Sequence, residues 1–258
     1  MIDSLKRSFN TYTKKPFLFV WGSMMYVFMV LVFLFAALGL LLAYFMFLSI
    51  IGQEFDLQSI PTLGFLAVIG LAFLFFSSGL NASLAKAYRS AFWKNNTSIT
   101  AFYTYALEKA PQNYAILLIR DFIWLMLAGP IIAIYIYFLE TVPYMDAIVG
   151  LVIVTITFVI HMMFTPALLS AGALEVSLFN SLRLGFNTLR RRHIMFIGLY
   201  FLFAIVWILN FIPFVQLVTI FFLYPVLYTA LIVMMENTGK QPSRSKKKRK
   251  IEEEEEEY

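Results

Sequence analysis

Three ionisable side chains inside apolar stretches are the first candidates for chemistry: Arg120, Asp121 and His161. Charged and titratable groups are costly in a membrane, so they are functional candidates by default. Asp121 lies seven residues after Tyr114, where one apolar stretch begins, and His161 lies eight residues before Leu169, where the next one ends. At a helical rise of 1.5 Å per residue, both would lie roughly 10–12 Å from the same boundary.

The spacing therefore predicts that Asp121 and His161 form an intramembrane polar pair within one hairpin. Three outcomes remain open: a hydrogen bond that locks the hairpin, a proton relay that would support transport, or no contact, with Asp121 facing water or another helix. Arg120 is not expected to pair with Asp121, because adjacent helical residues diverge by about 100°. Its side chain is expected to extend to the headgroups instead.

Other chemical patterns are not found in the sequence. There is no cysteine, so disulfides, cysteine–zinc sites and thiol nucleophiles are excluded. The only histidines, His161 and His193, are too far apart in sequence for the helical pair of zinc peptidases. No glycine-rich phosphate loop occurs, and no cluster of Asp or Glu residues resembles a metal site. We therefore predict no catalytic residue, no metal ligand, no cofactor and no enzymatic activity.

The composition indicates a multi-pass membrane protein. Of the 258 residues 61% are hydrophobic and only 14% are charged, whereas soluble domains are about one quarter charged. A membrane span needs about 20 apolar residues, and six stretches qualify: Phe17–Ile51, Ile60–Leu80, Tyr114–Leu139, Ala147–Leu169, Ile194–Ile212 and Phe214–Met235. The first is overlong, so we expect it to tilt, to project beyond the lipid or to bend near Gly39.

The positions of the charges predict the orientation. All but Arg120 of the 20 basic residues fall on one side of a six-span arrangement, and the loops of the other side carry only acidic charges. The positive-inside rule then places both termini in the cytoplasm, in a protein of the cell membrane. Residues 239–258, which end in KKKRKIEEEEEEY, read as a charged, disordered cytoplasmic tail.

One segment occurs twice. SLKRSFNTYTKKPFLF begins at Ser4 and SLRLGFNTLRRRHIMF begins at Ser181, each just before a predicted span. Each copy has an apolar stripe at helical spacing, which predicts an amphipathic helix in the membrane interface. The stripes are Ile2, Leu5, Phe9 and Tyr12 in the first copy, and Phe179, Leu182, Phe186 and Leu189 in the second. A short turn at Pro16 and at His193 is then expected to lead into the bilayer.

A weaker third copy around FYTY (Phe102–Tyr105) predicts the same unit before the middle hairpin. The fold class is therefore an all-α, six-helix membrane domain over residues 1–238. It consists of three hairpin units, about 1–97, 98–174 and 175–238, each preceded by an interfacial helix. Basic residues of these helices are predicted to contact anionic headgroups, namely Lys6, Lys14, Lys15, Arg183, Arg190, Arg191 and Arg192.

The second copy and the hairpin after it carry a family resemblance. SLRLGFNTLRRRHIMFIGLYFLFAIVWILNFIPFV resembles a broad group of six-helix integral membrane proteins of unknown function. The group includes the membrane domain of some glycerophosphoryl diester phosphodiesterases. The resemblance covers mainly Glu175–Glu236 and more weakly Ser4–Val20. It implies the six-helix fold and a membrane part without catalytic machinery, and it does not imply phosphodiesterase activity.

Two functions are compatible with these observations. The first is a non-enzymatic membrane protein that organises the bilayer or a membrane complex. The alternative is a small transporter or lipid-handling permease, which needs a polar cavity near the midplane with broken helices or paired charges around it. The expected partners are anionic lipids on the cytoplasmic side and a membrane protein or a second copy of the chain. No nucleic-acid partner is expected.

The predicted orientation can be tested by labelling single cysteines in this cysteine-free chain. A cysteine at Asp56 is expected to react only from outside the cell, and cysteines at Lys86 and Arg190 only from the cytoplasm. Labelling of position 56 from the cytoplasmic side alone would contradict the six-span topology.

Overall fold

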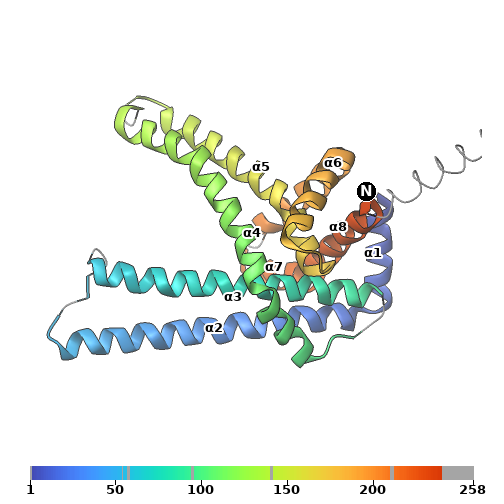
Figure 1. Cartoon of the computed structure of the whole chain (residues 1–258), viewed down its shortest axis with the longest axis horizontal. Coiled ribbons are helices and arrows are strands. Elements are labelled where there is room, and N and C mark those ends of the chain that lie inside the picture. The colour runs from blue at the N-terminus through green and yellow to red at the C-terminus, as the bar shows by residue number, and fades with distance from the viewer. Residues whose placement is uncertain are drawn as a thin grey trace, which may run out of the picture.

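The computed structural model describes residues 2–53, 55–56, 59–93, 96–139, 142–209 and 212–239. Every regular element in these ranges is a helix (Figure 1). The predicted tail therefore lies outside the described residues, apart from Gly239. In chain order the elements are α1 (Ile2–Lys14), α2 (Pro16–Ile50), α3 (Ile60–Phe92), α4 (Ile99–Ile134), the π-helix η1 (Tyr135–Leu139), α5 (Met145–Ala173), α6 (Leu178–Leu209), α7 (Pro213–Val218), the π-helix η2 (Thr219–Leu223) and α8 (Tyr224–Gly239).

Five helical segments are long and apolar enough to cross a membrane. They are Pro16–Ile50, Ile60–Phe92, Ile99–Phe138, Met145–Ala173 and Val215–Glu236. The prediction of an all-helical, multi-pass membrane protein is confirmed at this level. The predicted fifth span falls in α6, whose apolar part, His193–Val206, is shorter than the other five.

The turn predicted at Pro16 is confirmed. Helix α1 ends at Lys14 and α2 begins at Pro16, because proline has no N–H to continue the α1 hydrogen bonds and is favoured at the first helical position. Helix α2 then runs to Ile50 without interruption, so Gly39 does not break it.

The turn predicted at His193 is wrong. Helix α6 runs unbroken from Leu178 to Leu209, because no proline or other breaker lies at this junction. The segment around Phe102–Tyr105 and the predicted span after it also form one helix, since α4 continues past Pro111 to Ile134 instead of beginning a new span near Tyr114. In the part of the chain that the structure describes, the predicted interfacial segment and the predicted span are thus separate helices only at the N-terminus.

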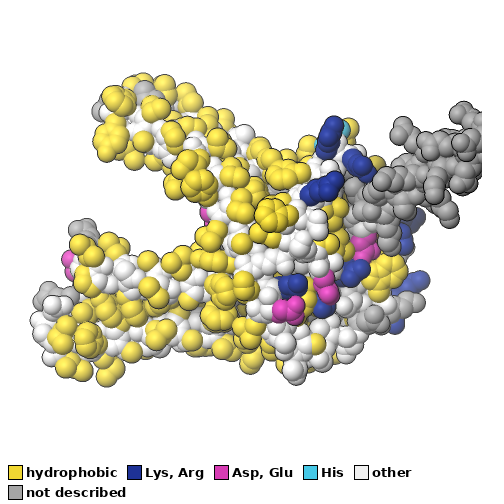
Figure 2. Space-filling model, viewed as in Figure 1, with side chains coloured by type: hydrophobic (Ala, Val, Ile, Leu, Met, Phe, Trp, Pro, Cys, Tyr) yellow, Lys and Arg dark blue, Asp and Glu magenta, His cyan; other side chains and the backbone are white. Residues whose placement is uncertain are grey.

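The helices pack together mainly at one end, which we call the charged end because Lys and Arg side chains gather there (Figure 2). In α3 the buried residues run from Ser78 to Phe92, apart from Thr62 near its start, and in α5 they begin at Ile160. Beyond this region the α2–α3 and α4–α5 hairpins separate (Figure 1).

This arrangement explains the overlong first apolar stretch. The early turns of α2 are packed against protein, with Phe19, Gly22 and Met25 buried. Most of its later large apolar residues are exposed, such as Phe35, Leu42 and Ile50. Only the later part therefore presents a continuous apolar surface of the kind that lipid covers.

Glycines allow very close helix contacts at the charged end. A Cβ atom at Gly79 in α3 would overlap the carbonyl oxygen of Ala106 in α4. A Cβ at Gly172 in α5 would lie 2.7 Å from the Cα of Ala82 in α3. Small residues let helix backbones approach closely in membrane proteins, so α3 is the central helix against which α4 and α5 pack.

The two copies of the repeated segment share a packing feature. Ser8 in α1 and Gly185 in α6 hold equivalent positions and are both buried. The phenylalanines that follow them, Phe9 and Phe186, are 46% and 44% exposed. In both copies the small residue packs against protein, and the phenylalanine after it is about half exposed.

Gly79→Ala is expected to destabilise the fold by about 1–3 kcal/mol, the usual cost of overpacking. The matched control is Gly70→Ala on the same helix, where a Cβ meets nothing within 4 Å and helix propensity favours alanine by up to about 1 kcal/mol. Thermal unfolding of the detergent-solubilised chain, followed by circular dichroism, measures both. Equal melting temperatures for the two variants would contradict the close α3–α4 contact.

Candidate functional site

Two ion pairs connect the last turns of α3 to other helices at the charged end. The Lys86 Nζ donates to Glu175 Oε1 at 2.9 Å, and the Arg89 Nε donates to Glu236 Oε1 at 2.6 Å. Glu175 lies between α5 and α6, and Glu236 lies in the last turns of α8. The two pairs therefore tie α3 to the connection between α5 and α6 and to α8.

Tyr105 in α4 lies beside the first ion pair. The Lys86 Nζ is 3.7 Å from the centre of the Tyr105 ring, a cation–π distance. The Tyr105 hydroxyl donates to the carbonyl oxygen of Gly172 at 2.6 Å. Lys86 thus contacts both a carboxylate and a ring, and these polar groups bind other helices of the same chain.

Glu175 is held in a specific backbone and charge environment. Its φ is +56°, in the left-handed region that few residues other than glycine adopt. The hydrogen bond from Lys86 lowers the pKa of the Glu175 carboxyl below its ordinary value, against the opposing effect of partial burial. The carboxylate is therefore kept charged where the chain turns from α5 into α6.

Hydroxyl groups of the first unit contact the π-helix η2. The Tyr12 hydroxyl donates to the carbonyl oxygen of Phe221 at 2.8 Å, and the Ser23 hydroxyl donates to that of Ile220 at 3.1 Å. The Ser23 hydroxyl is also 2.7 Å from the Tyr88 hydroxyl. A π-helix interrupts the regular pattern of backbone hydrogen bonds, and side chains of neighbouring helices satisfy such groups in membranes.

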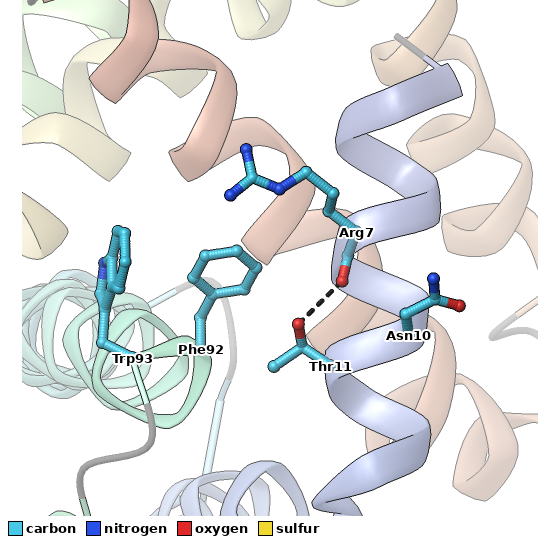
Figure 3. A pocket seen from close by; sticks show the side chains of 5 residues that line it. All are labelled: Arg7, Asn10, Thr11, Phe92 and Trp93. Carbon is cyan, nitrogen blue, oxygen red and sulfur yellow. Dashed lines mark hydrogen bonds between the residues drawn. The ribbon is translucent and has the colours of Figure 1, made fainter.

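A cavity of about 460 Å³ lies at the charged end between α1 and the end of α3. It is lined by Arg7, Asn10, Thr11, Phe92 and Trp93. Figure 3 shows the Arg7 side chain reaching from α1 toward the side where the two aromatic rings lie, with the Asn10 side chain pointing away. None of these five residues is among the site residues that the sequence predicts.

The charges of Arg120 and Asp121 both act on the His161 ring, and direct contact between Asp121 and His161 stays a prediction. The described residues show no hydrogen bond or ion pair between them. Instead the Arg120 guanidinium lies 2.6 Å from the Asp121 carboxylate, so the expectation that these neighbours cannot pair is wrong. The Cβ atoms diverge, but the long arginine side chain folds back to the carboxylate. Arg120 is 17% exposed and Asp121 is 49% exposed, so the carboxylate has both a partner and access to the surroundings.

The residues predicted to contact headgroups are on the surface where their side chains are described. Lys6, Lys14, Lys15, Arg183, Arg190 and Arg191 are all exposed. The Arg192 side chain lies outside the described part. Contact with anionic headgroups stays a prediction for this set.

The charged-end contacts are not predictable from local sequence patterns, because their partners are distant in sequence. Arg89 and Glu236 are 147 residues apart. One signal was present, since Glu236 ends an apolar segment and a carboxylate there needs a cation. Within the described residues, no group of three or more histidine, cysteine or acidic side chains is placed to hold a metal ion.

Comparisons with models of protein families, with curated proteins and with solved structures find no match to this chain.

The Arg89–Glu236 pair is expected to be important for stability, because the Glu236 side chain is only 9% exposed. Arg89→Gln leaves this carboxylate without its cation, which is expected to cost about 3 kcal/mol. The control Lys14→Gln removes an exposed charge and is expected to cost less than about 0.5 kcal/mol. Melting temperatures in detergent measure both.

A double variant separates charge burial from lost packing. Replacing both partners with apolar residues, Arg89→Met with Glu236→Leu, is expected to recover most of the stability lost in Arg89→Gln. If Arg89→Gln melts at the same temperature as Lys14→Gln, the pair does not hold α3 to α8.

Proposed function

We propose that this chain is a non-enzymatic integral membrane protein that organises the bilayer or a membrane complex. It crosses the cell membrane with six helices in three hairpins, and its termini and charged end face the cytoplasm. Supporting this orientation, the exposed basic residues lie at the charged end (Figure 2). The first turns of each unit lie at the membrane surface, with α1 as a separate interfacial helix and the others continuous with their spans.

The observation that carries the proposal is the separation of the two long hairpins beyond the charged end. Figure 2 shows an open space between the α2–α3 and α4–α5 hairpins with hydrophobic side chains on both sides. Large apolar residues of the outer parts are exposed, for example Leu71 at 52%, Phe122 at 60% and Leu151 at 69%. A fold that leaves this much apolar surface uncovered is suited to lateral contact with lipids or with helices of a partner or a second copy.

The polar contacts at the charged end support the same reading. Lys86, Arg89 and Tyr105 each bind a group of another helix in the same chain. These side chains hold the helices together, as a scaffold requires. The resemblance of Glu175–Glu236 to six-helix membrane proteins of unknown function stays a hypothesis that agrees with this proposal.

A lipid-handling permease is the second candidate, and the space between the hairpins favours it as well. A phospholipid that moves between leaflets needs a lateral opening for its tails and a polar contact for its headgroup. The half-exposed Asp121 with its partner Arg120 offers such a contact on the outer part of α4. This reading requires a measurable transport rate, whereas the first does not.

The two candidates differ in a reconstitution experiment. The full chain is incorporated into liposomes that contain a trace of a fluorescent phospholipid, and a membrane-impermeant quencher reports how fast the lipid changes leaflet. The proposed organiser leaves this rate equal to that of protein-free liposomes. A rate that rises in proportion to the amount of protein, and that falls when Asp121→Asn is used, would overturn the organiser and favour the permease.

A further inference from the structure

The cavity between α1 and the end of α3 has walls of opposite character. One wall carries Arg7, which is exposed. In the part of the chain that the structure describes, its guanidinium forms no ion pair. The hydrogen bond at this residue, donated by the Thr11 hydroxyl at 2.8 Å, goes to the Arg7 backbone carbonyl. Among the described residues the guanidinium is thus available to bind an anion, and its planar donors match a phosphate group well.

The other wall is electron-rich. The rings of Phe92 and Trp93 lie 5.3 Å apart at an angle of 89°, so they form a corner. Trp93 is 51% exposed, and tryptophan is the best aromatic partner for a cation. The corner also lies at the C-terminal end of α3, where the backbone carbonyls carry negative partial charge. Both features favour a positive group and disfavour a negative one.

The two walls together select a dipolar ligand, not a simple anion. We propose that this cavity binds the headgroup of a zwitterionic phospholipid, with the phosphate on Arg7 and the ammonium or trimethylammonium group against Trp93. The proposal rests on the proposed function only in placing the charged end at the membrane surface, where both tryptophan and such headgroups are found. It differs from the expected contacts of Lys6, Lys14 and Lys15, which favour anionic lipids without a shaped site.

Native mass spectrometry of the full chain in detergent tests the site. The protein is mixed with phosphatidylcholine or with phosphatidylglycerol of the same acyl chains, and the retained lipids are counted. We expect one molecule of phosphatidylcholine to be retained in preference to phosphatidylglycerol. Arg7→Gln and Trp93→Ala are each expected to weaken its retention about two- to fivefold, the effect of losing one cation contact at an exposed site.

Matched variants distinguish a loss of lipid binding from a loss of the fold. Lys6→Gln removes the neighbouring charge on α1 outside the cavity and is expected to leave phosphatidylcholine retention unchanged. Trp93→Phe keeps an aromatic face and is expected to retain more phosphatidylcholine than Trp93→Ala. Since Trp93 is half exposed, all four variants are expected to melt close to the original chain, which circular dichroism checks.

Three results would overturn the inference. They are equal or greater retention of phosphatidylglycerol, equal losses in Lys6→Gln and Arg7→Gln, and displacement of the lipid by millimolar inorganic phosphate as efficient as by soluble phosphocholine. The last would show an anion site only. Failure here leaves the leaflet-exchange measurement unaffected, so it is distinguishable from failure of the proposed function.

Discussion

The close approach of three helix backbones at the charged end is the contact on which the rest of the structure depends. Gly79 meets the backbone of α4, and Gly172 meets the backbone of α3. In lipid, apolar side chains gain little by leaving one apolar environment for another, so close packing and hydrogen bonds must hold helices together. Both are concentrated here, where Ser83 donates to the carbonyl oxygen of Phe102 and Tyr105 donates to that of Gly172.

Polar contacts around this region join further helices to it. The Arg89–Glu236 pair adds α8, and the hydroxyls of Tyr12 and Ser23 reach the π-helix that precedes it. Side chains of both α1 and α2 therefore join the η2–α8 segment to the N-terminal helices. This explains why Val215–Glu236 is by far the most buried of the five spanning segments, while the outer parts of the other two hairpins remain uncovered.

The sequence predicts the helices correctly where residues close together in the chain decide where a helix forms or ends. The apolar stretches predict the long helices, and Pro16 predicts the break after α1, because hydropathy and a missing N–H act within a few residues. It was misleading at His193, since a similar sequence context without proline does not end a helix. Contacts such as Arg89 with Glu236 depend on how distant helices pack. The Arg120–Asp121 pair depends on how a long side chain folds back. The spacing of apolar residues along the sequence predicts neither of these two contacts.

Fixing two long hairpins at one end has a mechanical consequence. Helix α2 has 35 residues, which at 1.5 Å per residue is a rod of about 50 Å, so a rotation of about 5° at its base moves the tip about 4 Å. A small rotation at the base therefore changes the distance between the far ends of the two hairpins more than any distance near the charged end. Bilayer thickness acts on helix tilt, so a thicker or thinner membrane changes that distance first, and the joint near Gly79 and Gly172 sets how stiffly the protein resists.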